Sequence, residues 1–96
     1  MDMDKTATWT FRLFVSGKTA QLDRMYTILK QICEEYLTEQ YTIEVIDVAK
    51  KPESAAKENI LATPTLLQVD PQPGKRIIGE LTDKEKVLQA LGLEKP

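Results

Sequence analysis

The strongest constraint on the fold is a long amphipathic helix that the first half of the sequence predicts. Apolar residues recur at steps of three and four from Ala20 to about Leu37, and charged and polar residues fill the positions between them. This spacing places the apolar side chains on one face of a helix of about five turns, which must be buried against another layer. The apolar stripe consists of Leu22, Met25, Ile28, Leu29, Ile32, Cys33, Tyr36 and Leu37.

Two predicted strands flank this helix. Residues 9–15, WTFRLFV, are rich in the aromatic and β-branched types that strands favour. Residues 41–48, YTIEVIDV, alternate in polarity, and we expect Ile43, Val45 and Val48 on the buried side. Because a helix that joins two neighbouring strands makes a right-handed crossover, these two strands should run parallel.

The second half of the sequence predicts a short helix followed by a hairpin. The helix begins at Pro52 or Glu53, since proline suits a first helical turn, and it ends near Ile60. Residues 65–69, TLLQV, and 76–81, RIIGEL, have the composition of strands. The segment between them holds two prolines and a glycine, which predicts a loop.

A last amphipathic helix is predicted near the C-terminus. The sequence Thr82-Asp83-Lys84-Glu85 has the pattern of a capping box, in which the Thr82 hydroxyl and the Glu85 carboxylate each accept a hydrogen bond from a backbone donor. Asp83 and Glu85 could instead form an acid pair, but their spacing favours capping. Gly92 suits the position that follows a helix end.

The resulting order, β-α-β-α-β-β-α, is that of a thioredoxin-like α/β fold with a mixed four-stranded sheet. We expect a single domain over residues 1–96, with a flexible N-terminus at 1–7, a folded core at 8–93 and a short tail at 94–96. Pro64 falls where this fold keeps a cis-proline, at the start of the third strand. The sequence leaves the isomer open, because both are accessible to an X-Pro bond.

The thiol chemistry of this fold class is missing from the sequence. Redox-active members carry two cysteines at the start of the first helix, where this chain has residues 16–21, SGKTAQ. The single cysteine, Cys33, lies on the apolar stripe, so we expect a buried side chain and not a reactive thiol. With no histidine, a Cys-His or Ser-His-Asp relay and a Cys/His zinc site are excluded within the chain. We therefore expect no catalytic residues, no metal and no cofactor.

The composition narrows the classes of partner. The net charge of −2 gives no electrostatic reason to expect nucleic acid or an anionic membrane. No apolar run is long enough to span a membrane and the N-terminus lacks a signal peptide, so we expect a cytoplasmic protein. Lys50, Lys51 and Lys57 could form a basic patch, although a solvated start of a helix is the commoner explanation.

Four segments together resemble the KaiB family. They are FRLFVSGKT, YTIEVIDVAKKPESA, ILATPTL and RIIGELTDKEKVLQAL, and they cover roughly residues 8 to 93 in the family's order. The resemblance implies a non-catalytic protein that binds the N-terminal ATPase ring of a hexameric KaiC-type kinase. It also implies that the bound protein captures KaiA and competes with the kinase SasA for the ring.

The resemblance further implies a fold switch. The family's ground state, usually a tetramer, has the order β-α-β-β-α-α-β, whereas the ring-binding monomer is thioredoxin-like, and about residues 50 to 93 are rebuilt between them. Gln89-Ala90 stands where family members often carry Ile-Gly, and alanine favours a helix over glycine by ~0.8–1 kcal/mol. We therefore expect a thioredoxin-like monomer, with the homotetramer as the alternative. The residues expected to govern the switch are Pro64, Pro71, Pro73, Ala90 and Gly92.

The resemblance also suggests a binding surface. Arg24 matches a family arginine on the first helix that is implicated in partner binding, and Tyr41 matches an aromatic residue at the start of the second strand. That strand is an outer one in the thioredoxin-like form, so KaiA could add a strand to its edge. The expected partner-binding residues are Arg24, Tyr41, Thr42, Glu44, Thr63 and Pro64.

Departures from the family pattern leave two alternatives open. Glu44 stands where the family often has lysine, and Leu67-Gln68 replaces Ala-Lys. The first alternative is therefore a paralogue that serves stress signalling and does not capture KaiA. The second is a thioredoxin-like domain with a residual redox or enzymatic role.

Overall fold

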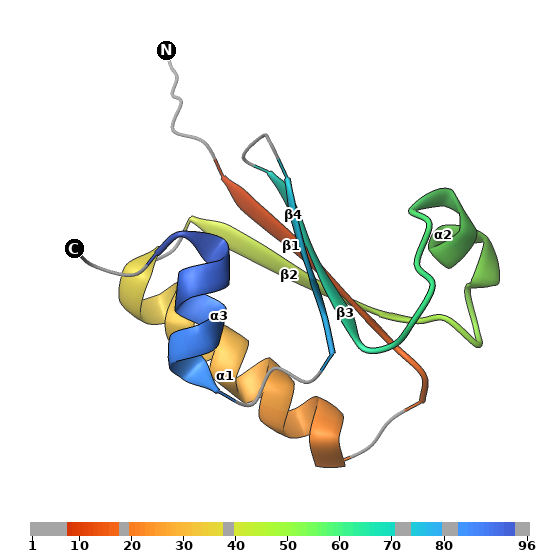
Figure 1. Ribbon diagram of the computed structural model, residues 1–96, viewed down its shortest axis with the longest axis horizontal. Helices are drawn as coiled ribbons and strands as arrows, with labels where there is room; N and C mark the ends of the chain where they lie inside the picture. Colours follow the sequence, from red (N-terminus) through yellow and green to blue (C-terminus); the bar gives the residue numbers. More distant parts are fainter. Residues whose placement is uncertain (1–7, 18–19, 38–39, 71–73, 80–82, 94–96) are drawn as a thin grey trace.

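The computed structural model describes residues 8–17, 20–37, 40–70, 74–79 and 83–93. Residues 1–7 and 94–96, and Pro71 and Pro73, for which the sequence made predictions, lie outside the described residues. The elements follow the predicted order β-α-β-α-β-β-α, and not the alternative β-α-β-β-α-α-β (Figure 1). They are β1 (Trp9–Val15), α1 (Ala20–Tyr36), β2 (Tyr41–Asp47), α2 (Pro52–Lys57), β3 (Thr65–Asp70), β4 (Lys75–Ile78) and α3 (Lys84–Leu91).

The four strands form one mixed sheet in the order β2-β1-β3-β4. β1 and β2 run parallel, in register from Trp9 opposite Tyr41 to Val15 opposite Asp47, which confirms the predicted crossover through α1. β3 pairs antiparallel with both β1 and β4. The fold is therefore thioredoxin-like, and β2 and β4 are the outer strands of the sheet.

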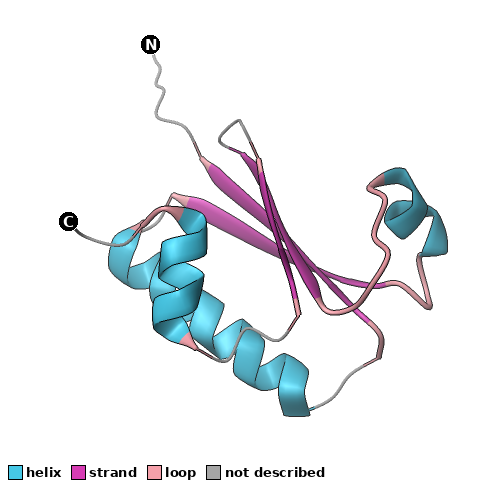
Figure 2. Cartoon of the chain, in the orientation of Figure 1, coloured by secondary structure: helices cyan, strands magenta, loops and turns pink. Residues whose placement is uncertain are grey.

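The helices lie on opposite faces of the sheet. α1 and α3 lie together on one face, called here the α1/α3 face, and α2 lies on the other, called the α2 face (Figures 1 and 2). Successive residues of a strand point to opposite faces, so Phe11, Leu13 and Val15 of β1 pack under the two helices. Phe14 and Ile46 are buried on the α2 face.

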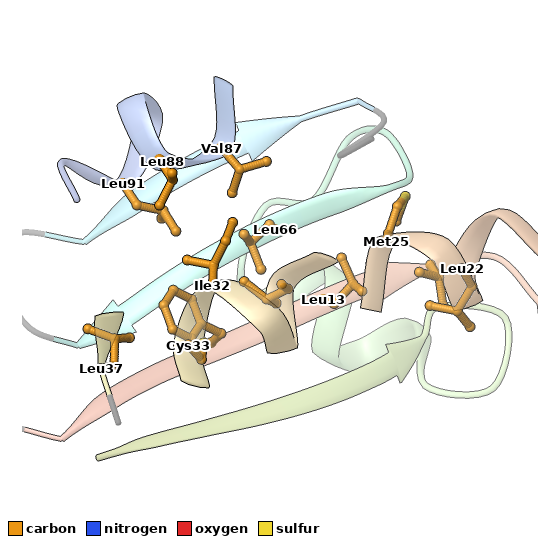
Figure 3. Packing of buried hydrophobic residues seen from close by; sticks show 13 residues of the cluster. Leu13, Leu22, Met25, Ile32, Cys33, Leu37, Leu66, Val87, Leu88 and Leu91 are labelled. Carbon is orange, nitrogen blue, oxygen red and sulfur yellow. The ribbon is translucent and has the colours of Figure 1, made fainter. Parts of the chain in front are cut away.

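One apolar cluster fills the space between the α1/α3 face and its two helices (Figure 3). α1 contributes the stripe that the sequence predicted, and Cys33 within it is fully buried. α3 adds three buried side chains and β3 adds Leu66. Burial of each large apolar side chain stabilises the fold by roughly 1.5–3 kcal/mol. The buried residues supplied by the helices are Leu22, Met25, Leu29, Ile32, Cys33, Val87, Leu88 and Leu91.

The predicted buried side of β2 is partly wrong. Ile43 packs against the cluster, but Val45 is 41% exposed, and Ile46 is the buried residue of this strand, on the opposite face. Val48 lies beyond the end of β2 and is half-buried. The physical reason is that β2 is an outer strand: beside Val45, α1 leaves a hollow lined by Leu22, Asp23, Tyr26 and Thr27.

The start of α3 also differs from the prediction. The N-cap is Asp83, whose carboxylate accepts hydrogen bonds from the backbone nitrogens of Glu85 (3.1 Å) and Lys86 (3.4 Å). The predicted cap, Thr82, was placed one residue too early and lies outside the described residues. The Asp83 carboxylate therefore serves as a helix cap, as the spacing of Asp83 and Glu85 favoured. At the other end of α3, Gly92 has a φ of +75°, the left-handed conformation expected of a residue that ends a helix.

Two other boundaries shift by a few residues. α2 ends at Lys57 and not near Ile60, because the chain turns away at Asn59, which has a φ of +57°. Asparagine adopts this left-handed conformation more readily than most residues. β4 begins at Lys75, one residue earlier than predicted, and ends at Ile78.

Candidate functional site

The place of the thioredoxin thiols is occupied by the turn from β1 into α1. Gly17, at a φ of +81°, donates a backbone hydrogen bond to Oδ1 of Asp47 (3.3 Å). Thr63 and Pro64 face this turn, and the peptide bond between them is cis. A small cavity of about 90 Å³ lies between the two segments, lined by Val15, Ser16, Gly17, Leu22, Met25, Thr63 and Pro64. None of these lining residues carries a thiol.

Cys33 is remote from this turn and chemically protected. Its side chain is buried between α1 and the sheet, and burial raises the pKa of the thiol to about 12. The thiolate is the nucleophilic form, so the thiol is inert at neutral pH. The predicted buried cysteine is confirmed.

The outer edge of β2 presents free backbone groups. Trp9 donates its backbone N–H to the carbonyl of Gln40 (3.0 Å), and Val48 donates to the carbonyl of Val15 (2.9 Å). With the register of this parallel pair, these bonds assign the even-numbered residues of β2 to the ladder with β1. Tyr41, Ile43 and Val45 therefore direct their N–H and C=O groups outward. Such an edge can accept a strand from a partner.

Tyr41, at the start of this edge, is held by two side chains of α1. Its hydroxyl donates a hydrogen bond to Oε2 of Glu34 and accepts one from Nζ of Lys30 (3.3 Å). The same Nζ lies 5.6 Å from the centroid of the Tyr41 ring. The bond to the Glu34 carboxylate raises the pKa of Tyr41, and the bond to Tyr41 raises the pKa of Lys30. Tyr41 is therefore fixed in orientation at the surface.

Glu44, in the middle of the same strand, is joined to Arg12 of β1. The two residues are register partners, and Nε of Arg12 lies 3.4 Å from Oε1 of Glu44. The Glu44 side chain is half exposed, so an approaching chain can still reach it. Nη1 of Arg12 also lies 3.2 Å from Oε2 of Glu58, just beyond α2.

The structure brings only part of the predicted partner-binding set together. Tyr41, Thr42 and Glu44 share β2. Arg24 is exposed on α1, beside a hollow lined by Asp23, Thr27, Ile28 and Gln31. Thr63 and Pro64 lie before β3, at the turn described above. The candidates thus occupy three places: a strand edge, a helix surface and a loop.

Several surface features were missed by the sequence reading. Three large apolar side chains are exposed among the described residues: Leu61 (95%), Ile78 (65%) and Val45 (41%). The contact of Arg12 with Glu44 could have been found, because opposite charges stand at equal offsets in two strands expected to be parallel. Arg76 donates hydrogen bonds to the backbone carbonyls of Glu58 (2.8 Å) and Asn59 (2.9 Å), which the sequence does not predict because they depend on how the hairpin packs.

Two comparisons with known proteins point to the same family over most of the chain. A sequence model of the KaiB domain matches residues 12–93. The chain is 46% identical over 86 residues to the circadian clock oscillator protein KaiB of Microcystis aeruginosa, a match that covers 90% of this chain and 83% of that protein. Within the residues that the structure describes, no helix is long and apolar enough to cross a membrane.

Two solved structures share the fold. The N-terminal domain of SasA from Synechococcus elongatus superposes with a TM-score of 0.75 at 20% identity, covering 100% of this chain and 94% of that domain. The germline-specific thioredoxin Deadhead of Drosophila melanogaster has a TM-score of 0.67 at 16% identity, covering 88% of this chain and 79% of that protein. At such identities the likeness concerns the fold alone.

Proposed function

This chain belongs to the KaiB family, and we propose that it is a non-catalytic binding protein that docks on a KaiC-type ATPase ring and regulates circadian or clock-related signalling. One observation carries the proposal: a KaiB-family chain folds like a thioredoxin, yet the place of the thiols holds only a glycine-containing turn. Its remaining cysteine is buried and protonated at neutral pH. Docking on such a ring would place the protein in the cytoplasm.

The proposed secondary partner is a protein that adds a strand to β2. The free N–H and C=O groups of Tyr41, Ile43 and Val45 support this mode. Tyr41, Thr42 and Glu44 would supply side-chain selectivity, and the partner would be KaiA. A SasA-type kinase would instead compete with this chain for the ring. Arg24 remains a proposed contact near this edge, because the hollow beside it and the hollow beside Val45 share Asp23 and Thr27. Thr63 and Pro64 remain proposed contacts at the turn before β3.

The proposed active form is the thioredoxin-like monomer. In this form Ala90 lies inside α3 and Gly92 ends it, so both suit the helix that the family's alternative state would lose. Pro64, Pro71 and Pro73 would lie in the half that is rebuilt. A sedimentation run dominated by tetramer would contradict the monomer.

The direct test of the proposal is a titration of the full chain against KaiC-type hexamers loaded with ADP or with ATP. We expect a saturable complex in at least one nucleotide state, measured by fluorescence anisotropy of the labelled chain. Failure to bind in every nucleotide state, by a chain shown by NMR to be folded, would contradict ring docking.

A proline substitution tests the strand edge. Val45→Pro removes one outward N–H and leaves the ladder with β1 intact, because edge strands tolerate proline where the N–H faces solvent. The matched control, Val45→Ala, keeps the N–H and removes the exposed side chain. If KaiA adds a strand to β2, the proline variant loses binding of KaiA and the alanine variant keeps it. Equal binding by both variants would exclude strand addition at this position.

One observation favours the paralogue with another signalling role as a second candidate. Glu44 is half exposed on the β2 edge. The family resemblance suggests a lysine at this position, which carries the opposite charge. A partner selected for the family's lysine would meet a carboxylate here, and like charges across an interface cost affinity. Glu44→Lys should then gain binding to KaiA if the wild-type chain has lost it.

The remaining alternative is a thioredoxin-like domain with a residual redox role. It predicts activity in an insulin-reduction assay, where we expect none.

A further inference from the structure

The placement of α2 needs an explanation that its own sequence does not supply. The helix has six residues, none of which is buried. Isolated helices shorter than ~12–15 residues are marginal in water. Its N-cap residue, Lys51, makes no side-chain capping bond. Ser54 and Ala55 are only half-buried, and polar contacts join the C-terminal end of α2 to the sheet.

Arg76 of β4 binds that end through two backbone carbonyls. Its Nη2 donates to the carbonyl of Glu58 (2.8 Å) and its Nη1 donates to the carbonyl of Asn59 (2.9 Å). Carbonyls at the end of a helix lack intrahelical donors, and a charged donor binds them more strongly than a neutral one. Arg76 can reach them because it pairs with Leu67 in the hairpin and points to the α2 face.

Arg12 of β1 contacts the side-chain carboxylate of Glu58. Its guanidinium spans Glu58 on one side (3.2 Å) and Glu44 of β2 on the other (3.4 Å). Glu58 is thus held twice, by its carboxylate from β1 and by its carbonyl from β4. Asn59 then turns the chain away at a φ of +57°, which presents the segment that carries the exposed Leu61.

We propose that Arg12 and Arg76 form a clamp on Glu58 and Asn59 that couples the position of α2 to the pairing of β4. When β4 pairs with β3, Arg76 faces the α2 face and holds the end of α2; when β4 leaves, this contact is lost. The clamp therefore makes α2 and β4 form or separate as one unit. A second consequence rests on the proposed function. Arg12 lies in the first half of the chain, which is expected to keep its fold, and Arg76 lies in the second half, which is expected to be rebuilt. The clamp joins the two halves only in the thioredoxin-like form and therefore stabilises that form.

Tryptic cleavage after Lys57 measures the opening of the clamp. Lys57 is the exposed last residue of α2, so its cleavage follows local opening, whereas cleavage after Lys30 inside α1 follows global unfolding. We expect Arg76→Met to accelerate cleavage after Lys57 by ~10-fold, the size of one charged hydrogen bond, and to leave cleavage after Lys30 unchanged. Both rates are read by mass spectrometry.

Two further variants control this experiment. Lys75→Met changes the neighbouring residue of β4, which pairs with Gln68 and faces the α1/α3 face, so it should leave cleavage after Lys57 unchanged. Arg76→Lys keeps the charge but cannot bridge two carbonyls as a guanidinium does, so it should fall between wild type and Arg76→Met. The clamp is overturned if cleavage after Lys57 is unchanged in Arg76→Met, or if cleavage after Lys30 accelerates equally.

The same variant separates the clamp from the fold switch. If both are correct, Arg76→Met accelerates cleavage after Lys57, and its NMR spectrum shows a second set of signals or its sedimentation shows a tetramer. If the cleavage accelerates but only thioredoxin-like monomer is present, the clamp stands and the proposed rearrangement is contradicted for this chain.

Discussion

On the α1/α3 face, two helices bury a continuous apolar cluster against the sheet, whereas on the α2 face a helix of six residues buries none of its own. The first face is held by packing, which is lost only when the helices leave the sheet. On the second face Phe14 and Ile46 of the sheet are buried, but the end of α2 contacts β1 and β4 through hydrogen bonds and an ion pair from Arg12 and Arg76. The comparison teaches that one sheet can carry a layer held by apolar packing beside a detachable layer held mainly by polar contacts.

The same substitution on the two faces should have the largest contrast. Ile32 on α1 is fully buried, so Ile32→Ala should lower the free energy of unfolding by about 2–5 kcal/mol. Ile78 on the α2 face is 65% exposed, so Ile78→Ala should change it by no more than about 0.5 kcal/mol. Urea unfolding measures both. A loss of similar size in both variants would mean that the α2 face is packed as firmly as the other.

Alkaline pH should weaken the packed face through Cys33. Burial raises the pKa of this thiol to about 12, whereas in the unfolded chain it is ~8.5. The free energy of unfolding is therefore unaffected by this thiol below pH ~8.5. It decreases by up to ~1.4 kcal/mol per pH unit as the pH rises towards 12, because the unfolded chain loses the thiol proton first. Unfolding free energies measured at pH 8 and pH 10 should diverge more for wild type than for Cys33→Val. Equal slopes in the two proteins would contradict the burial of the thiol.

The cap of α3 should make a smaller contribution. Asp83→Ala removes the acceptor for the backbone N–H groups of Glu85 and Lys86, so we expect a loss of about 1 kcal/mol in urea unfolding. Glu85→Ala is the matched control; it removes the carboxylate of the predicted capping box and keeps the Asp83 cap, so we expect a loss of only a few tenths of that size. A larger loss for Glu85→Ala than for Asp83→Ala would move the cap back to the predicted box.

The sequence predicted the packed face well because local periodicity carries its information. The three- and four-residue steps of α1 placed Cys33 among buried residues, and the strand-helix-strand order required β1 and β2 to be parallel. Val45 was placed wrongly because alternation within a strand shows which residues share a face, but not whether a helix covers that face. The cap at Asp83 was missed because adjacent threonine and aspartate are both good caps.

The α2 face could not be predicted in the same way. The bonds of Arg76 to Glu58 and Asn59 span 18 and 17 residues and require both the hairpin register and the turn at Asn59. No periodic signal marks such a contact. Likewise, the candidate partner residues were taken from the family pattern, and the fold distributes them over an edge, a helix and a loop.

Native-state hydrogen exchange by NMR tests the contrast between the two faces most directly. The amide of Ile60 bonds to the carbonyl of Ala55 at the end of α2, and the amide of Ile32 lies inside α1. We predict that Ile32 exchanges only through global unfolding, while Ile60 exchanges through a local opening at least about 2 kcal/mol less costly and insensitive to low concentrations of urea. Equal opening free energies with equal urea dependence would show one cooperative unit and contradict a detachable α2 face.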